Sequence, residues 1–484
     1  MAENRQEREI IRSSRDVSIV IPDNDTDNLV EEEDIKEDKD SALADAILKN
    51  AGMALSLGVI CEVPNNLDTP NRNRYEPTTA AIGPYHRKKE HQHVTEALKT
   101  SYLAALLSRP RQEQTSLEHI IKAMREKEYE FKSSYGHHKE KIKLLTSDEC
   151  VKMMILDGCF ILELIYKFKE YKVGAMEEGY KTMDPIFSYT WMLRHLQRDL
   201  ILLENQLPFS VLKDLFDLTS DPKHNESLSD LVVNFLDPEI QTYGIPRNDE
   251  LTGKHLLDLV RNHLLGKSPQ KNYGKYPNWK LTRYCAADLK NAGVVFKKNE
   301  NAKSLLDITF NDQDGNLIIP PFFFGEGMIV YLQNLIALEQ SSSNYTSHIT
   351  SYVIFLDTLI KSKEDVKLLR SEGIINGSLN EEKKMARTIN GLYSRAIVDS
   401  FYYDELYQRV NAFCEQDKQK RRVLVRQWSI EFFDNFSTPW RAISVSLGLA
   451  VTLLTLTLTI ISLISTFKKR THAPMGYSVL SQVF

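Results

Sequence analysis

Residues 151–168 read VKMMILDGCFILELIYKF, a run that is apolar on almost every side when it is wound into a helix. A helix that is apolar nearly all round is buried, because it has no face suited to water. Ser147 precedes the run as a candidate N-cap, and Glu149 places an acid in the first turn. We therefore predict a central core helix here and a mainly α protein around it.

Helical patterns continue on both sides of this helix. They cover residues 93–109 and 116–135 before it and 191–218 after it, and Pro208 divides the last segment because proline removes a donor and clashes with the preceding turn. Together these segments predict a large helical bundle. The pattern resumes in residues 328–340, 348–362, 363–375, 381–393 and 403–436.

A small β element is expected between the two sets of helices. Residues 286–298 are typical of a helix that ends at Gly293, in a left-handed cap, and runs into a short strand. The apolar stretches SLLDITF and LIIPPFFF then flank NDQDGN, which has the composition of a hairpin turn. We predict an inserted β-hairpin near residues 304 to 324.

A proline-rich segment, residues 61–86, comes before the first helices of the bundle. Its four prolines exclude a long helix. It is too apolar for open solvent, so we expect it to pack on the bundle. The apolar side chains in and beside it are Val59, Ile60, Val63, Leu67, Tyr75, Ile82 and Tyr85.

The ends of the chain differ from the middle in composition. Residues 1–40 are polar, include the acidic run EEEDIKEDKD, and are predicted to be a disordered tail. A helical body of residues 41–436 follows, and its first helix begins at Ser41. Residues 442–467 contain no charge, and about 26 residues of helix can span the hydrocarbon core of a bilayer. They predict a transmembrane helix, with residues 468–484 as a short C-terminal tail.

The side of the membrane on which the body lies is less clearly indicated. The N-terminus has no apolar signal region, so we expect insertion after translation, a cytosolic body and a single span, in the plasma membrane. The cluster of Lys468, Lys469 and Arg470 would favour the opposite orientation. Glycosylation sequons would matter only for a body outside the cytosol, and they lie at Asn24, Asn225, Asn344, Asn376 and Asn435.

Composition limits the class of partner. A net charge of −5 with 26% charged residues describes an ordinary solvated surface, so we predict no nucleic-acid partner. The cysteine count is odd and the cysteines are widely spaced, which favours reduced thiols over a disulfide scaffold. They are Cys61, Cys150, Cys159, Cys285 and Cys414.

The chain contains none of the standard catalytic signatures, and we predict no catalytic, cofactor-binding or metal site and no cofactor. His86, His91 and His93 lie close together but lack further ligands at regular spacing. Asp199 and Glu204 are five residues apart, so they would not share one helix face. We expect Asp199 to pair with an arginine, and Glu204 and Asn205 to satisfy backbone groups near Pro208.

Eight motifs in a fixed order resemble those of a plant family known as domain of unknown function 247, also called uncharacterised protein family 0481. They are ICEVPNNL, YEPTTAAIGPYH, MMILDGCFILELIYKF, RDLILLENQLPF, SLLDITF, IPPFFF, LIALEQ and ITSYVIFLDTLI. The resemblance covers about residues 58 to 467. The family pattern usually continues after His86 with a second histidine and a glycine, whereas this chain has Arg87 and Lys88. This departure from the family pattern argues against a role for a histidine pair in this chain.

This resemblance implies a plant-specific, mainly helical, membrane-anchored protein without an established enzymatic activity. In grasses, members of the family are associated with self-incompatibility loci. The leading hypothesis is a non-enzymatic interaction, signalling or recognition protein with protein partners. The alternative is an unrecognised enzyme with a pocket near Tyr85, His86, Asp199 and Glu204, and a third hypothesis is a scaffold that forms homo-oligomers through its anchor.

Overall fold

The structure is a computed structural model, and its contacts group residues 1–57 apart from residues 58–484. It describes residues 58–64, 67, 72–87, 93–110, 115–135, 142–174, 184–220, 226–240, 251–266, 284–377, 381–393, 396–398, 400–416, 425–431 and 439–471. The predicted acidic tail and the predicted helix that begins at Ser41 lie outside these residues.

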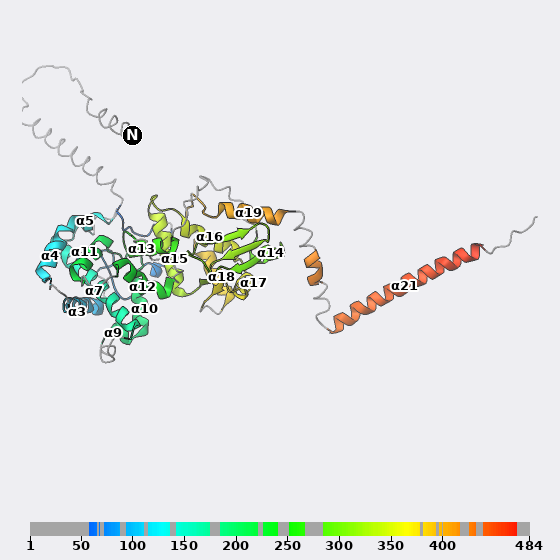
Figure 1. Cartoon of the computed structure of the whole chain (residues 1–484), viewed down its shortest axis with the longest axis horizontal. Helices are drawn as coiled ribbons and strands as arrows, with labels where there is room; N and C mark the ends of the chain where they lie inside the picture. Colours follow the sequence, from blue (N-terminus) through cyan, green and yellow to red (C-terminus); the bar gives the residue numbers. More distant parts are fainter. Residues whose placement is uncertain are drawn as a thin grey trace, which may run out of the picture. The chain divides into compact units, whose positions relative to one another are not determined.

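The central element is α7 (Ser147–Lys172), whose side chains are buried from Cys150 to Ile165 apart from Lys152. This confirms the predicted core helix, although its N-cap is Thr146 and not Ser147. The Thr146 side chain accepts the backbone N–H of Glu149, and the Glu149 side chain reaches back to Thr146. Around α7 pack α3 (His93–Leu107), α4 (Leu117–Glu126), α5 (Glu128–Ser133), α11 (Phe209–Thr219) and α12 (Leu228–Ile240) (Figure 1).

The segment before Pro208 differs from the prediction. After the short helix α9 (Pro185–Ser188), α10 (Thr190–Asp199) ends well before the proline, and residues 200–207 form turns and extended chain. Leucine and isoleucine side chains at positions 200–203 are buried there, so the residues still belong to the core. Proline thus marks the start of α11, and it does not end the helix before it.

A second group of helices follows from α13 (Leu256–Leu265) onward. α15 (Glu326–Ser341) packs against α10, α12, α13 and α16 (His348–Leu359), and thereby joins the two groups. α17 (Lys363–Ser371) contacts α14 (Ala286–Asn291) and α18 (Glu382–Gly391), and α19 (Asp404–Glu415) contacts the β element. Residues 425–431 are also helical.

The predicted hairpin is present, within a larger β element. β2 (Thr309–Asn311) pairs antiparallel with β3 (Asn316–Ile319), and β1 (Val295–Lys298) adds a parallel strand on the other side of β3. Gly293 has φ +89°, which confirms the left-handed cap before β1. The pairing of β4 (Phe322–Phe323) with β5 (Ile375–Asn376) joins segments that are distant in sequence and was not predicted.

The proline-rich segment packs on the bundle, as predicted. Ile60, Leu67, Tyr75, Ile82 and Tyr85 are all at most 7% exposed. Its regular structure is the 3₁₀ turn η1 (Arg72–Arg74) and a bridge between Ile60 and Tyr135.

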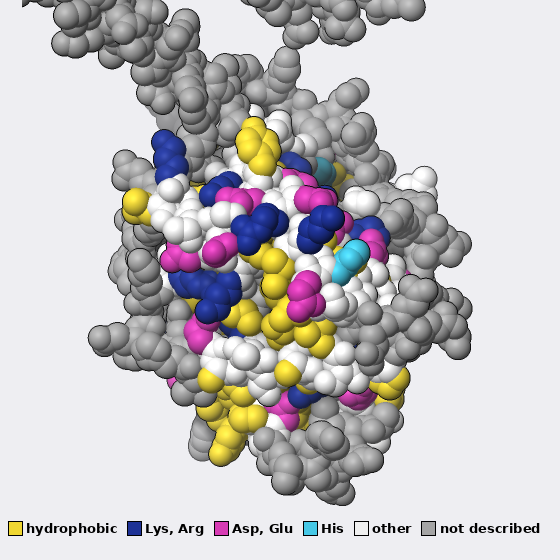
Figure 2. Space-filling view, turned by 90° about the vertical axis from the view of Figure 1, so that its left-hand side faces the viewer, with side chains coloured by type: hydrophobic (Ala, Val, Ile, Leu, Met, Phe, Trp, Pro, Cys, Tyr) yellow, Lys and Arg dark blue, Asp and Glu magenta, His cyan; other side chains and the backbone are white. Residues whose placement is uncertain are grey.

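α21 (Pro439–Thr471) contains the predicted apolar run. Within it, residues Ser446–Ser465 have a mean hydropathy of 2.3 and none of this stretch is buried, so α21 is long and apolar enough to cross a membrane. The surface of the body is different in character. On the face shown in Figure 2, lysine and arginine side chains alternate with acids around hydrophobic ones.

Candidate functional site

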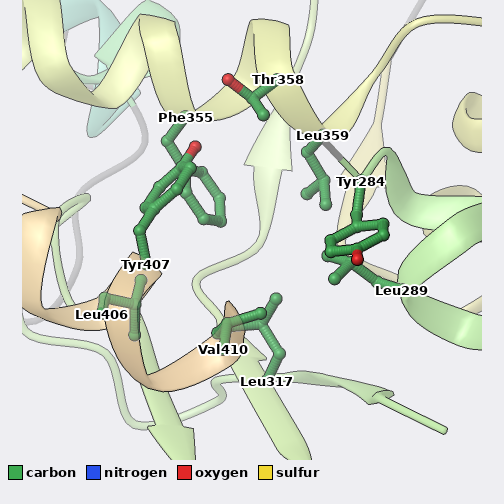
Figure 3. A pocket seen from close by; sticks show the side chains of 9 residues that line it. All are labelled: Tyr284, Leu289, Leu317, Phe355, Thr358, Leu359, Leu406, Tyr407 and Val410. Atoms are coloured by element: carbon green, nitrogen blue, oxygen red, sulfur yellow. The ribbon is translucent and has the colours of Figure 1, made fainter. Parts of the chain in front are cut away.

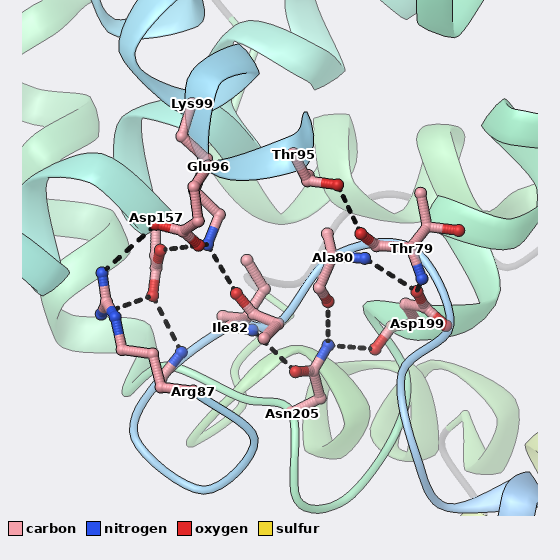
Figure 4. Close-up of polar contacts among 12 residues, drawn as sticks. Thr79, Ala80, Ile82, Arg87, Thr95, Glu96, Lys99, Asp157, Asp199 and Asn205 are labelled. Carbon is pink, nitrogen blue, oxygen red and sulfur yellow. Dashed lines mark hydrogen bonds and ion pairs between the residues drawn. The ribbon is translucent and has the colours of Figure 1, made fainter. Parts of the chain in front are cut away.

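Lys99 and Asp157 form an ion pair in the interior of the bundle. Both side chains are fully buried, and Lys99 Nζ lies 2.7 Å from Asp157 Oδ1 (Figure 4). Lys99 Nζ also donates to the carbonyl of Ala81 at 2.6 Å, and Asp157 Oδ2 accepts the backbone N–H of Gly83 at 2.9 Å. Buried charges persist only when they are paired and hydrogen-bonded. The pair therefore ties α3 and α7 to the proline-rich segment.

Asp199, the last residue of α10, binds the proline-rich segment at residues 78–80, just before the residues that Lys99 and Asp157 contact. Its carboxylate accepts the backbone N–H groups of Thr78, Thr79 and Ala80 at 3.1, 2.6 and 3.0 Å. Burial raises the pKa of Asp199, and these three donors offset part of that rise. The predicted arginine partner is replaced by backbone donors, because the proline-rich chain has no regular structure to satisfy them.

Asn205 binds backbone groups between the points that Asp199 and Asp157 hold. Its Oδ1 accepts the N–H of Ile82 at 2.7 Å, and its Nδ2 donates to the carbonyls of Ala80 at 3.0 Å and Asp199 at 2.8 Å. We call Lys99, Asp157, Asp199, Glu204 and Asn205 the polar cluster. Figure 4 shows four of these side chains directed at the backbone of residues 79–83.

At Gly83 the proline-rich segment approaches the rest of the body closely. It has φ +69°, and a Cβ atom there would lie 2.6 Å from the carbonyl oxygen of Gln206. That carbonyl also accepts the hydroxyl of Tyr135 at 2.9 Å. Only glycine combines this backbone conformation with so close an approach.

Glu204 and His86 are brought together, as the enzyme hypothesis requires, but Asp199 is bound elsewhere. Glu204 Oε2 lies 3.1 Å from His86 Nε2, and Glu204 Oε1 accepts the N–H of Val63 at 2.9 Å. Glu204 thus does bind a backbone group, but in the proline-rich segment and not near Pro208. Tyr85 donates to the carbonyl of Ile60 at 3.3 Å.

Tyr85 also lines a pocket of about 590 Å³ together with Arg87, Glu96, Glu149 and Lys152. Burial is the main cause that raises the pKa of the Tyr85 phenol, with further contributions from Glu62 and the Cys61 thiol. The phenol is therefore neutral near pH 7 and can donate a hydrogen bond there. The charges of the lining are of both signs, so the pocket has no marked preference for anions or cations.

Another cavity, lined mainly by apolar side chains of α14, α16, α19 and β3, is too small for a ligand. Its volume is about 20 Å³, and Figure 3 shows Phe355, Tyr407 and Leu359 around it. Space of this size holds about one water molecule. It is a packing defect of the core.

The described residues offer no arrangement of side chains suited to a metal ion. No group of three or more histidine, cysteine and carboxylate side chains that could hold a metal ion occurs in that part of the chain. Of the three histidines considered from the sequence, His91 lies outside the described residues, and His86 contacts Glu204.

Lys99 and Asp157 were missed from the sequence, although a signal for them was present. Asp157 is an acid inside a run that is apolar on every side, and a buried acid needs a partner. Lys99 lies in the helical segment HVTEALKTSYLAALL. Neither residue belongs to a catalytic signature, so a search for such signatures passes over both.

Comparison with known proteins supports the resemblance seen in the motifs. The model of the family DUF247, described as plant protein of unknown function, matches residues 60–456. The chain is 27% identical over 435 residues to the UPF0481 protein At3g47200 of Arabidopsis thaliana, covering 84% of this chain and 86% of that protein. It is 20% identical over 451 residues to the putative UPF0481 protein At3g02645 of the same plant, covering 73% and 82%. No solved structure matches.

Proposed function

The chain belongs to the plant family DUF247, and from this premise we propose that it is a membrane-anchored protein that acts by binding other proteins and not by catalysis. The observation that carries the proposal is that side chains of the polar cluster bind the protein's own backbone. Asp199 and Asn205 direct their hydrogen-bonding atoms at backbone groups of residues 78–82. Side chains engaged in this way hold a segment in place and are not free to react.

The second support is α21. Its apolar stretch, Ser446–Ser465, is entirely exposed, and a helix of that composition in water would be costly. A bilayer removes this cost. We propose a single span in the plasma membrane with the body in the cytosol, and a role in recognition or signalling such as the self-incompatibility that the family resemblance suggests.

A pair of exposed aromatic side chains offers a surface for a protein partner. Tyr189 and Trp191 are 57% and 56% exposed, and their rings lie 6.3 Å apart at the start of α10. Tyrosine and tryptophan are enriched among the residues that dominate binding energy in interfaces. We propose that this pair contacts the partner.

Membrane anchoring is tested by fractionation of the full chain in plant cells. The variant Leu449→Arg/Leu453→Arg/Leu456→Arg should move from the carbonate-resistant membrane fraction to the soluble fraction, because each buried arginine costs about 2.5–3.5 kcal/mol near the centre of a span. The matched variant with three phenylalanines at the same positions should stay in the membrane. Release of the unaltered chain by carbonate would reject the anchor.

Partner binding is tested by crosslinking in intact cells, followed by measurement of complex size. We expect a complex larger than the protein alone that is lost in Tyr189→Ala/Trp191→Ala and kept in Tyr129→Ala, which removes a tyrosine that is 85% exposed on α5. Equal complexes in all three proteins would argue against this surface. A protein that stays alone and turns over a substrate would reject the proposal.

The second candidate function is that of an enzyme, and it rests on the contact between His86 and Glu204. The buried pair of His86 and Glu204, at 3.1 Å, is of the kind that shuttles protons. A hydrolytic or proton-transfer activity of the purified chain, lost in His86→Gln and in Glu204→Gln with the fold retained, would favour this candidate over the first.

A further inference from the structure

A pocket of about 530 Å³ lies between α10, α15, α18 and residues 73–78 of the proline-rich segment. Among the described residues, four cationic side chains line it, and Glu326 is the one acid. The cations are Arg74, Arg194, Arg198 and Lys384. Pockets of this volume are typical of sites for small molecules.

Among the residues that the structure describes, Arg74, Arg198 and Lys384 form no ion pair. An electrostatic interaction joins Arg198 to Asp199, whose carboxylate is engaged with the backbone of residues 78–80. Arg74 Nη1 donates to the neutral amide of Gln333 at 3.1 Å, and Arg198 Nη2 donates to the carbonyl of Asn73 at 2.7 Å. The Nε atom of Arg198 is buried and has no hydrogen-bond partner.

The other arginines that are buried or half-buried in the described part of the chain all pair with a carboxylate. Arg109 pairs with Glu163 at 2.6 Å, and Arg261 pairs with Glu339 at 3.0 Å. An arginine that is partly buried without a counter-charge pays the cost of desolvation and gains no ion pair in return. A bound anion would supply the missing counter-charge in the pocket.

The local geometry also favours an anion. Arg194 and Arg198 are four residues apart on α10, so their side chains lie on one face. Glu326 and Gly327 bring the first turn of α15 to the pocket, and the N-cap of α15 is Gly325, which has no side chain to accept the first N–H groups. Such a helix start attracts negative charge, and here it adds to the cations.

We propose that this pocket binds a small polyanion that carries several phosphate groups. Guanidinium groups match phosphate oxygens in pairs, and only a ligand with several negative charges balances four cations. The source is either a soluble inositol phosphate or the headgroup of a phosphoinositide lipid, since both present the same clustered phosphates. The proposal goes beyond partner binding and does not depend on it.

The test uses the full chain in phosphatidylcholine nanodiscs. Inositol hexakisphosphate is titrated by calorimetry, and binding to phosphatidylcholine vesicles is compared with and without phosphatidylinositol bisphosphate. The variant Arg198→Gln/Lys384→Gln should lose affinity at least about tenfold, as expected when charge-assisted hydrogen bonds are removed. Lys383→Gln/Arg387→Gln is the matched control. It removes the same two residue types from exposed positions of α18 outside the pocket lining and should stay within about twofold.

The two binding measurements distinguish a soluble ligand from a lipid headgroup. Selective binding of the soluble compound identifies a soluble ligand, and selective binding of the phosphoinositide vesicles identifies a lipid headgroup. If Arg198→Gln unfolds the protein, Arg194→Gln/Lys384→Gln replaces it, because both of these side chains are exposed. No binding in either arm, or an equal loss in the pocket and control variants, would overturn the proposal.

Discussion

Asp157 and Lys99 show how a buried pair stabilises a segment that has little regular structure. Each charge is fully buried and relies mainly on the other and on the backbone of Ala81 and Gly83. Glu96 and Arg87, which are partly exposed, add a second opposite charge beside Lys99 and Asp157, respectively. Removal of one buried partner therefore leaves the other with only this partly exposed counter-charge.

We expect Asp157→Asn to lower the free energy of unfolding by up to about 3–5 kcal/mol, because the fully buried Lys99 then keeps only the partly exposed Glu96 as a counter-charge. Urea unfolding of the full chain in detergent, followed by circular dichroism, measures this loss. The double variant Lys99→Met/Asp157→Leu should lose less than Asp157→Asn does, since it leaves no buried charge. A loss below about 1 kcal/mol for Asp157→Asn would contradict the importance of the pair.

Gly83 and Gly174 form a matched pair for a second prediction. Both have φ +69°, but a Cβ at Gly83 meets the Gln206 carbonyl at 2.6 Å, whereas one at Gly174 meets nothing within 4 Å. Gly174→Ala should cost only the left-handed penalty of about 1–2 kcal/mol. Gly83→Ala should cost about 2 kcal/mol more because of the clash, as measured by thermal or urea unfolding. Equal losses would mean that the segment moves away freely.

At the scale of elements, Asp365 connects the start of α17 to the start of α14. Its carboxylate accepts the N–H of Ser362 at 2.8 Å, of Lys361 at 3.1 Å and of Ala287 at 2.9 Å. Burial raises the pKa of Asp365, but these hydrogen bonds outweigh burial and leave the pKa below the ordinary value of 3.8.

The lowered pKa of Asp365 sets the sign of a pH dependence. Its contribution to stability is full above the unfolded value of 3.8 and is lost as the pH falls through the folded pKa. Asp365→Asn should therefore cost about 1 kcal/mol near pH 7, and the difference from the parent should shrink as the pH falls below the unfolded value of 3.8 and through the folded pKa. Glu364→Gln, an exposed change in the same turn, is the control and should show little difference at either pH.

Elements with strong local patterns could be predicted from the sequence, and their ends could not. The 26 residues of α7 follow from the apolar run, yet the N-cap is Thr146, because the hydroxyl of Ser147 contacts Arg125 and Glu128 instead. The end of α10 depends on the contacts of Asp199 with residues 78–80, more than a hundred positions earlier. Contacts over such separations leave no local pattern.

For the candidate site too, one part could be predicted from the sequence and another could not. Its proline-rich segment was predicted to pack on the bundle, because its apolar residues indicate burial. The partners that hold it, Lys99 and Asp157, come from two other helices, and only the folded arrangement brings them together. The strand β1 was predicted, but its parallel pairing with β3 was not, since β3 lies beyond the intervening hairpin strand.

At the scale of the whole molecule, two sequons report on the side of the membrane. Asn344 and Asn376 are both exposed on the body. If the body is cytosolic, as proposed, neither will carry a glycan, and treatment with a glycosidase will leave the electrophoretic mobility unchanged. A mobility shift that is abolished by Asn344→Gln/Asn376→Gln would place the body outside the cytosol.

The contacts of Glu204 also have a consequence for synthesis on the ribosome. Val63 and Glu204 are 141 positions apart. At about 5–20 residues per second, the proline-rich segment leaves the ribosome roughly 7–30 seconds before its partner is made. During that interval Ile60 and Ile82 have no core to enter, so the nascent chain exposes apolar surface that a chaperone can bind. Translation speed between Val63 and Glu204 therefore sets how long the emerging protein is open to aggregation.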